Sequence, residues 1–170
     1  MFIYRLDSSN HFHCINGCNF ILRIMKTEQI LSVEQTKHLQ ELGLDMSDAS
    51  IYWARVSHGS RIYDKSKGKW FMSLQKEFQT CGFISYETLP TYTLQDILDK
   101  LPESVQVYDL YIFKKVGLWW LKYVDVTNNG TVRLEKMPKL IDAAYYMLCW
   151  CIQKGFVKTN KEVKDGRKEN

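Results

Sequence analysis

The stretch from Val107 to Gly155 most constrains the fold, because it contains three strand-like runs followed directly by one long apolar helix. Each run is rich in aromatic and β-branched residues, and turn residues separate one run from the next. Consecutive strands joined by short turns predict an antiparallel sheet. The predicted strands are Val107–Lys114, Leu118–Val126 and Thr131–Glu135.

The helix that follows is predicted from Pro138 to Lys154. Proline suits the first helical position, because its missing N–H has no partner there. Gly155 is a typical residue just after a helix end. Apolar side chains surround most of the circumference, so the helix should be largely buried. We therefore expect an α+β fold, in which a mostly antiparallel sheet carries one long C-terminal helix on one face and shorter helices lie around it.

Side-chain sorting decides the expected register of the sheet. A three-residue turn, with Gly130 at positive φ, pairs Val126 with Val132 and Val124 with Leu134, whereas the usual two-residue Asn-Gly loop pairs charged residues with apolar ones. The same parity, carried back to the first strand, gives two apolar faces. The first contains Tyr108, Leu110, Ile112, Leu118, Trp120, Val124, Val126, Val132 and Leu134, with Lys122 as the exception, and the second contains Tyr111, Phe113, Trp119, Leu121 and Tyr123.

Two apolar faces are unusual, because antiparallel sheets commonly have one side in water. We expect the long helix to cover the first face, so that Trp120→Ala costs about 3–5 kcal/mol. The second face is covered by the shorter helices or is open to a partner. The candidate partner-binding residues on it are Tyr111, Phe113, Trp119 and Tyr123.

Two shorter helices are predicted from their capping patterns. Ser32 to Gln35 forms a capping box that opens a helix ending near Gly43, and Thr93 to Asp96 opens a second helix that stops at Pro102. Between them, strands are predicted at Ile51–Ser57 and Arg61–Tyr63, and the stretch Trp70–Phe78 fits either a helix or a strand.

Length and composition indicate one domain, from residue 25 to 155, within a chain of 170 residues and net charge +4. Residues 156–170 contain five basic and three acidic side chains, and we expect a disordered basic tail there. No apolar run approaches the ~20 residues that span a bilayer. Five cysteines, an odd count, and the absence of a signal-peptide pattern favour a reducing, cytoplasmic setting.

Residues 1–24 differ in character from the rest and form a leader. Either the native chain starts at Met25, or the leader adds an edge strand at Cys18–Ile24. The leader also holds the one metal-like spacing of the chain, which matches no zinc finger or ribbon. We therefore predict neither a metal nor a cofactor. The residues of that spacing are His11, His13, Cys14 and Cys18.

No pair of side chains has a catalytic spacing. Ser57 and His58 are adjacent in a tight turn and form no nucleophile elbow. Cys149 and Cys151 lie two apart on a helix, which is not a redox spacing, and His38 has no evident carboxylate partner. Four carboxylates near one helix end are not paired as acid and base, so an unrecognised enzyme is only an alternative. These carboxylates are Asp96, Asp99, Glu103 and Asp109.

Three segments together resemble a set of short uncharacterised proteins from gut Bacteroidetes and their prophages or mobile elements. They are Ser32-Val33-Glu34-Gln35 continuing to Leu42-Gly43, Leu89 to Leu98, and Met147-Leu148-Cys149-Trp150. The resemblance covers residues 25–155 and is weakest between 57 and 88. It implies a bacterial or phage setting and supplies no catalytic residue or cofactor.

The expected function is therefore that of a small non-enzymatic binding or accessory protein of a phage or mobile element, which acts through contacts with an unknown protein or with itself. The aromatic content of 14% supports a contact surface. The alternative is weak nucleic-acid binding by the basic tail and by Lys65, Lys67 and Lys69, which lie in a loop without the phosphate-binding pattern.

Overall fold

The computed structural model of the protein describes residues 29–58, 68–77 and 85–160. The leader with its metal-like spacing, the predicted strand Arg61–Tyr63, Lys65, Lys67 and the last ten residues lie outside this part. The predicted α+β class is confirmed. The elements, in order, are α2 Val33–Glu41, β1 Ile51–His58, β2 Phe71–Ser73, β3 Ser85–Thr91, α3 Leu94–Lys100, β4 Ser104–Val105, β5 Tyr108–Lys115, β6 Leu118–Val124, β7 Thr131–Met137 and α4 Leu140–Gln153.

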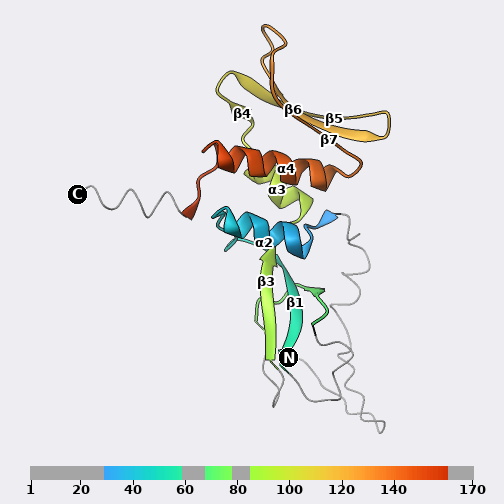
Figure 1. The fold of residues 1–170 in the computed structure, drawn as a ribbon, viewed down its shortest axis with the longest axis vertical. Coiled ribbons are helices and arrows are strands. Elements are labelled where there is room, and N and C mark those ends of the chain that lie inside the picture. The colour runs from blue at the N-terminus through green and yellow to red at the C-terminus, as the bar shows by residue number, and fades with distance from the viewer. Residues whose placement is uncertain (1–28, 59–67, 78–84, 161–170) are drawn as a thin grey trace, which may run out of the picture.

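The elements form an elongated stack (Figure 1). An antiparallel sheet of order β4-β5-β6-β7 lies at one end. Helices α4 and α3 lie beneath it, α2 follows, and a smaller sheet of order β2-β1-β3 extends to the other end (Figure 1). The stack therefore holds its helices between two sheets.

Local sequence explains where the helices start. The hydroxyl of Ser32 accepts from the amide of Gln35, whose side chain accepts from the amide of Ser32. Thr93 and Asp96 form the same reciprocal pair at the start of α3. Both predicted capping boxes are confirmed. Helix α4 begins at Leu140, two residues later than predicted, with no side-chain cap at Lys139.

The predicted packing of the long helix on the sheet is confirmed. Leu148 and Met147 of α4 are fully buried, as is Leu121 of β6, and all three belong to one core cluster with residues of α2 and α3. The cluster extends beyond the end of α4, where the ring of Phe156 packs against Trp150 and Thr159 is buried. The packed region therefore reaches past residue 155.

The predicted sheet faces are wrong at the β5–β6 turn. Val116 and Gly117 form a two-residue turn, and both have positive φ. That turn pairs Ile112 with Leu121 and Phe113 with Trp120. Opposite residues of an antiparallel pair share a face, so Leu121, and not Trp120, points toward α4. The physical reason is that a two-residue turn with positive φ at both positions fits the twist of the strands.

The register predicted for β6 and β7 is wrong by two residues. Leu134 pairs with Lys122 instead of Val124, and a bulge places Val124 opposite Thr131. The loop is longer than predicted, since the amide of Asp125 donates to the carbonyl of Gly130. The left-handed residue is Asn129, with φ 56°, instead of Gly130.

The turn at Val116 gives a first testable prediction. Val116 has φ 51° and is 91% exposed, so its β-branched side chain occupies a strained conformation without making packing contacts. Val116→Asn, which creates the preferred Asn-Gly pair, is expected to raise the free energy of unfolding by about 1 kcal/mol. Thermal unfolding checks it: Tm should rise by about 2–4 °C. A lower Tm would contradict this turn.

Candidate functional site

The face of the β4–β7 sheet that points away from α4 is the main candidate. The cross-strand pairs place ten side chains on it, and no helix or strand of the described residues lies over it (Figure 1). We call this surface the open face. It consists of Asp109, Tyr111, Phe113, Lys115, Leu118, Trp120, Lys122, Val124, Leu134 and Lys136.

Aromatic rings and lysines alternate at one end of the open face. The rings of Phe113 and Trp120 are stacked, with centroids 5.7 Å apart and planes 22° apart. The ammonium of Lys136 lies 4.0 Å from the centroid of the Trp120 ring. Lys122 lies 5.6 Å from the Phe113 ring and 6.0 Å from the Tyr111 ring. We call these five residues the cationic-aromatic end.

One polar atom at this end has no partner. The indole N–H of Trp120 is buried, and no hydrogen-bond acceptor of the described residues contacts it. A buried donor without an acceptor costs about 1–3 kcal/mol, so such groups usually meet a partner, a water or a ligand.

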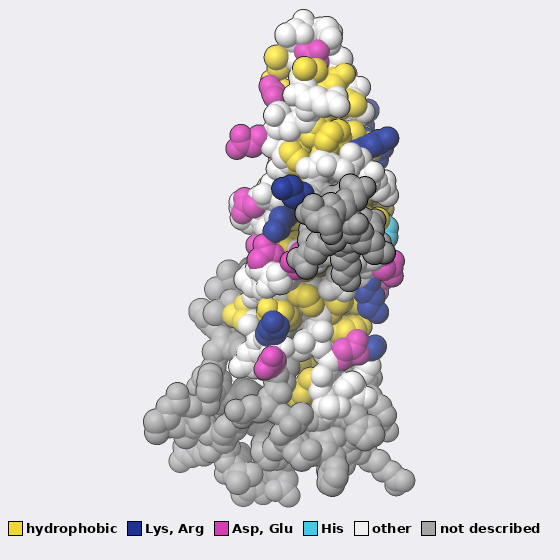
Figure 2. All heavy atoms as spheres, turned by 90° about the vertical axis from the view of Figure 1, so that its left-hand side faces the viewer, with side chains coloured by type: hydrophobic (Ala, Val, Ile, Leu, Met, Phe, Trp, Pro, Cys, Tyr) yellow, Lys and Arg dark blue, Asp and Glu magenta, His cyan; other side chains and the backbone are white. Residues whose placement is uncertain are grey.

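Exposed aliphatic side chains gather around the β6–β7 hairpin, and one of them, Leu134, pairs with Lys122 of the cationic-aromatic end. Asp109 of β5 pairs with Val124 of β6, so the start of β5 lies beside this hairpin. We call these residues the aliphatic end: Val107, Val126, Val132 and Leu134, exposed by 65%, 56%, 45% and 37%. Figure 2 shows hydrophobic side chains reaching the surface in the upper part of the molecule, beside Lys or Arg side chains.

The four predicted partner-binding residues do not form one surface. Tyr111 and Phe113 lie on the open face, as part of the cationic-aromatic end. Trp119 and Tyr123 lie on the face toward α4, and Tyr123 is fully buried with its hydroxyl donating to the carbonyl of Pro102 at 2.7 Å. Sequence reasoning missed Lys136 and placed Trp120 under the helix. The two-residue turn at Val116 and Gly117 causes this difference, because it determines which residues of β6 share a face with those of β5.

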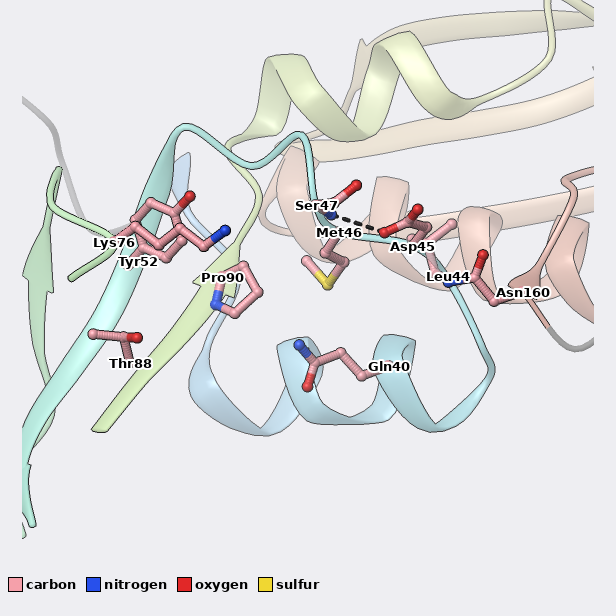
Figure 3. Close-up of a pocket in the computed structure, with 10 residues that line it drawn as sticks. All are labelled: Gln40, Leu44, Asp45, Met46, Ser47, Tyr52, Lys76, Thr88, Pro90 and Asn160. Atoms are coloured by element: carbon pink, nitrogen blue, oxygen red, sulfur yellow. Dashed lines mark hydrogen bonds between the residues drawn. The ribbon is translucent and has the colours of Figure 1, made fainter. Parts of the chain in front are cut away.

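A hollow of about 430 Å³ is a second candidate (Figure 3). It lies between α2, the loop after it and strands β1 and β3, and Gln40, Tyr52 and Thr88 line it. The carboxylate of Asp45 in its wall accepts from the amide of Ser47, so this carboxylate closes a turn. The lining combines single polar groups with no nucleophile–base pair, and it indicates no reaction.

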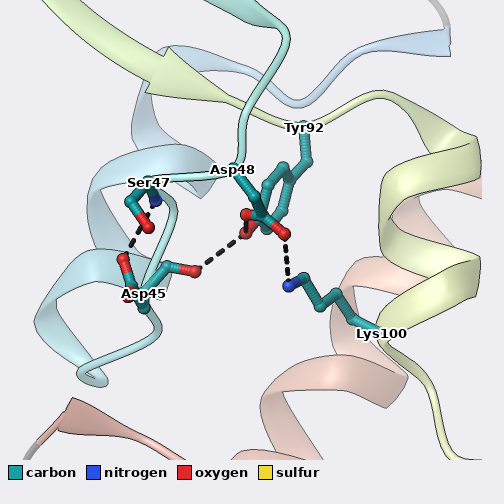
Figure 4. A network of polar contacts seen from close by, with 5 residues as sticks. All are labelled: Asp45, Ser47, Asp48, Tyr92 and Lys100. Carbon is teal, nitrogen blue, oxygen red and sulfur yellow. Dashed lines mark hydrogen bonds and ion pairs between the residues drawn. The ribbon is translucent and has the colours of Figure 1, made fainter.

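A polar network holds the same loop against the core (Figure 4). The buried Tyr92 hydroxyl donates to the carboxylate of Asp48 at 2.5 Å and lies 2.8 Å from the carbonyl of Asp45. Lys100 pairs with the other oxygen of Asp48 at 2.6 Å. Lys100 and Tyr92 lower the pKa of Asp48, and burial raises the pKa of Tyr92. Tyr92 therefore stays protonated as a donor, and the network is structural.

This network gives a pH-dependent prediction. The pKa of Asp48 is lowered in the folded state, so its interactions stabilise the fold above about pH 4 and are lost as the pH falls through the folded-state pKa. Tyr92→Phe removes one donor to a well-exposed carboxylate, and it should cost about 1 kcal/mol at neutral pH. Urea unfolding of parent and variant should differ less at about pH 3. An equal difference at both pH values would contradict the role of Asp48.

A thiol, an imidazole and a phenol meet between α2 and α4. The hydroxyl of Tyr145 lies 2.6 Å from Nδ1 of His38, and Sγ of Cys149 lies 3.8 Å from the same nitrogen. Burial raises the pKa of Cys149 to about 11, so the thiol stays protonated at neutral pH. A protonated, buried thiol is a poor nucleophile, and these contacts join the two helices. Cys151 is also buried, with its pKa raised by burial to about 11.

Two of the carboxylates near the end of α3, Asp96 and Asp99, are bound to different neighbours. Asp96 caps α3 and the side chain of Gln95 donates to Asp99. Within residues 29–58, 68–77 and 85–160, no group of His, Cys, Asp or Glu side chains has the geometry to hold a metal ion. Lys69, the described member of the basic loop, is exposed.

No family model, curated protein or solved structure matches the chain. In the part that the structure describes, no helix is long and apolar enough to cross a membrane.

Proposed function

We propose that this chain is a small non-enzymatic binding protein whose aliphatic end contacts another protein. The observation that carries the proposal is the gathering of Val107, Val126, Val132 and Leu134, exposed by 37% to 65%, at one end of one sheet. Contiguous exposed apolar surface of this kind marks protein contact sites, whereas single exposed apolar residues carry no such meaning.

Two further features support a contact surface in place of an active site. The hollow lacks a nucleophile–base pair, and the Cys149 thiol beside His38 is buried and protonated at neutral pH. The sheet that carries the aliphatic end is fixed from behind by α4, so a partner would meet a preformed surface. The resemblance to proteins of gut Bacteroidetes and their prophages supports an accessory role in a phage or mobile element, in the bacterial cytoplasm.

Charge insertion tests the proposal. Val132→Glu combined with Leu134→Glu should abolish retention of a partner in affinity capture from a phage-carrying host, because unpaired charge in an apolar contact is costly. Val116→Glu is the matched control, since Val116 is 91% exposed at the opposite end of the sheet. Light scattering distinguishes a second copy of the chain from a different protein. Equal retention by the double variant and the parent would overturn the proposal.

A further inference from the structure

We propose that the cationic-aromatic end of the open face binds single-stranded nucleic acid. This site adjoins the aliphatic end, because Leu134 pairs with Lys122, but it rests on different observations: unneutralised lysines, aromatic rings and an unpaired indole N–H. Neither Lys65 nor Lys67 nor the tail contributes to the argument.

The first step concerns charge. The open face carries Lys115, Lys122 and Lys136 against the single carboxylate of Asp109. The ion pairs found in the described segments join Arg55 to Glu87, Lys100 to Asp48 and Arg133 to Glu135, so none neutralises these three lysines. Protein–protein contacts are depleted in lysine, whereas phosphate groups attract it. The charge of this end therefore favours a phosphate backbone over a second copy of the same basic face.

The second step concerns the rings. Tyr111 and Phe113 lie two positions apart on one strand, about 7 Å, and Trp120 lies beside Phe113 on the next strand. In the structure, the ammonium groups of Lys122 and Lys136 lie against these rings. Tyr111 is exposed, and Phe113 and Trp120 are half-buried. Lysine side chains are long and flexible, so they can move to phosphates while bases stack on the accessible faces of these rings. A duplex keeps its bases inside the helix, and the flat arrangement therefore fits a single strand.

The third step concerns the unpaired indole N–H of Trp120. Lys136 lies over the indole ring, 4.0 Å from its centroid, and moves away when it pairs with a phosphate. Base carbonyls and phosphate oxygens are acceptors that could then reach the N–H. One ligand class thus supplies the anion, the planar ring and the acceptor that this end lacks.

Fluorescence anisotropy of the full chain with labelled oligothymidylate and oligouridylate, each about fifteen nucleotides long, tests the inference. With three lysines on phosphates, Kd for a single strand should rise about twenty-fold between about 50 and about 200 mM salt. Lys122→Gln with Lys136→Gln should weaken binding at low salt and reduce that rise to about three-fold. Trp120→Leu should weaken binding at every salt concentration, because it removes the stacking ring.

Controls separate the possible outcomes. Lys69→Gln with Lys76→Gln removes two exposed lysines near the smaller sheet and should leave Kd unchanged. Absence of binding at about 50 mM salt, or equal losses in the two lysine pairs, would overturn the inference. Displacement by poly-glutamate as effective as by oligothymidylate would also overturn it and indicate an acidic protein ligand. Val107→Glu with Val126→Glu changes two exposed residues of the aliphatic end that are not paired with any of the three lysines. This variant should retain most of the affinity, so the result is independent of the proposed protein contact.

Discussion

Leu121→Ala is expected to destabilise the protein more than Trp120→Ala, although tryptophan is the larger side chain. Leu121 is fully buried between β6 and α4, and its truncation leaves a cavity in the shared core. Such a change costs about 3–4 kcal/mol. Trp120 lies on the open face with one side against Phe113, and its loss should cost only about 1–2 kcal/mol.

Urea denaturation followed by circular dichroism measures both values, with unchanged m-values showing that the comparison is valid. The reverse order, with Trp120→Ala costing more, would place Trp120 under the helix. That result would support the sheet faces that the alternation of side chains alone predicts. The two variants therefore test the register of the whole sheet.

The sequence predicts those parts of the fold that depend on local chemistry. Reciprocal capping at Ser32 and Thr93 involves neighbours in the chain, so the start of α2 and α3 could be predicted. The burial of α4 follows from its apolar circumference. The sequence does not predict strand β3, because a proline such as Pro90 argues against a strand. Pro90 is tolerated because β3 is an edge strand of the smaller sheet.

The candidate surface could be predicted only in part. Tyr111 and Phe113 were placed together on one face, and the structure keeps them together. The alternation of side chains alone assigns Trp119 and Tyr123 to the same face, because a valine at position 116 gives no sign of the left-handed turn that it forms. One residue of slip exchanges the faces of β6. The cationic-aromatic end was therefore not recognisable before the turn geometry was known.

The second large effect is expected at a buried hydroxyl pair between α2 and β3. Thr36 and Thr91 are both fully buried, and their Oγ1 atoms are 2.7 Å apart. The hydroxyl of Thr36 donates to the carbonyl of Ser32, so the proton between the two hydroxyls comes from Thr91. Thr36→Val removes the acceptor of that buried donor and should cost about 2–3 kcal/mol.

The matched variants show whether an unpaired donor is the cause. Thr91→Val leaves the Thr36 hydroxyl bound to Ser32, so it should cost only about 0.5 kcal/mol. The double variant replaces both hydroxyls with methyl groups of similar volume and should therefore be more stable than Thr36→Val alone. A thermodynamic cycle of the four proteins measures this coupling. Strictly additive costs would show that the two hydroxyls do not share a proton.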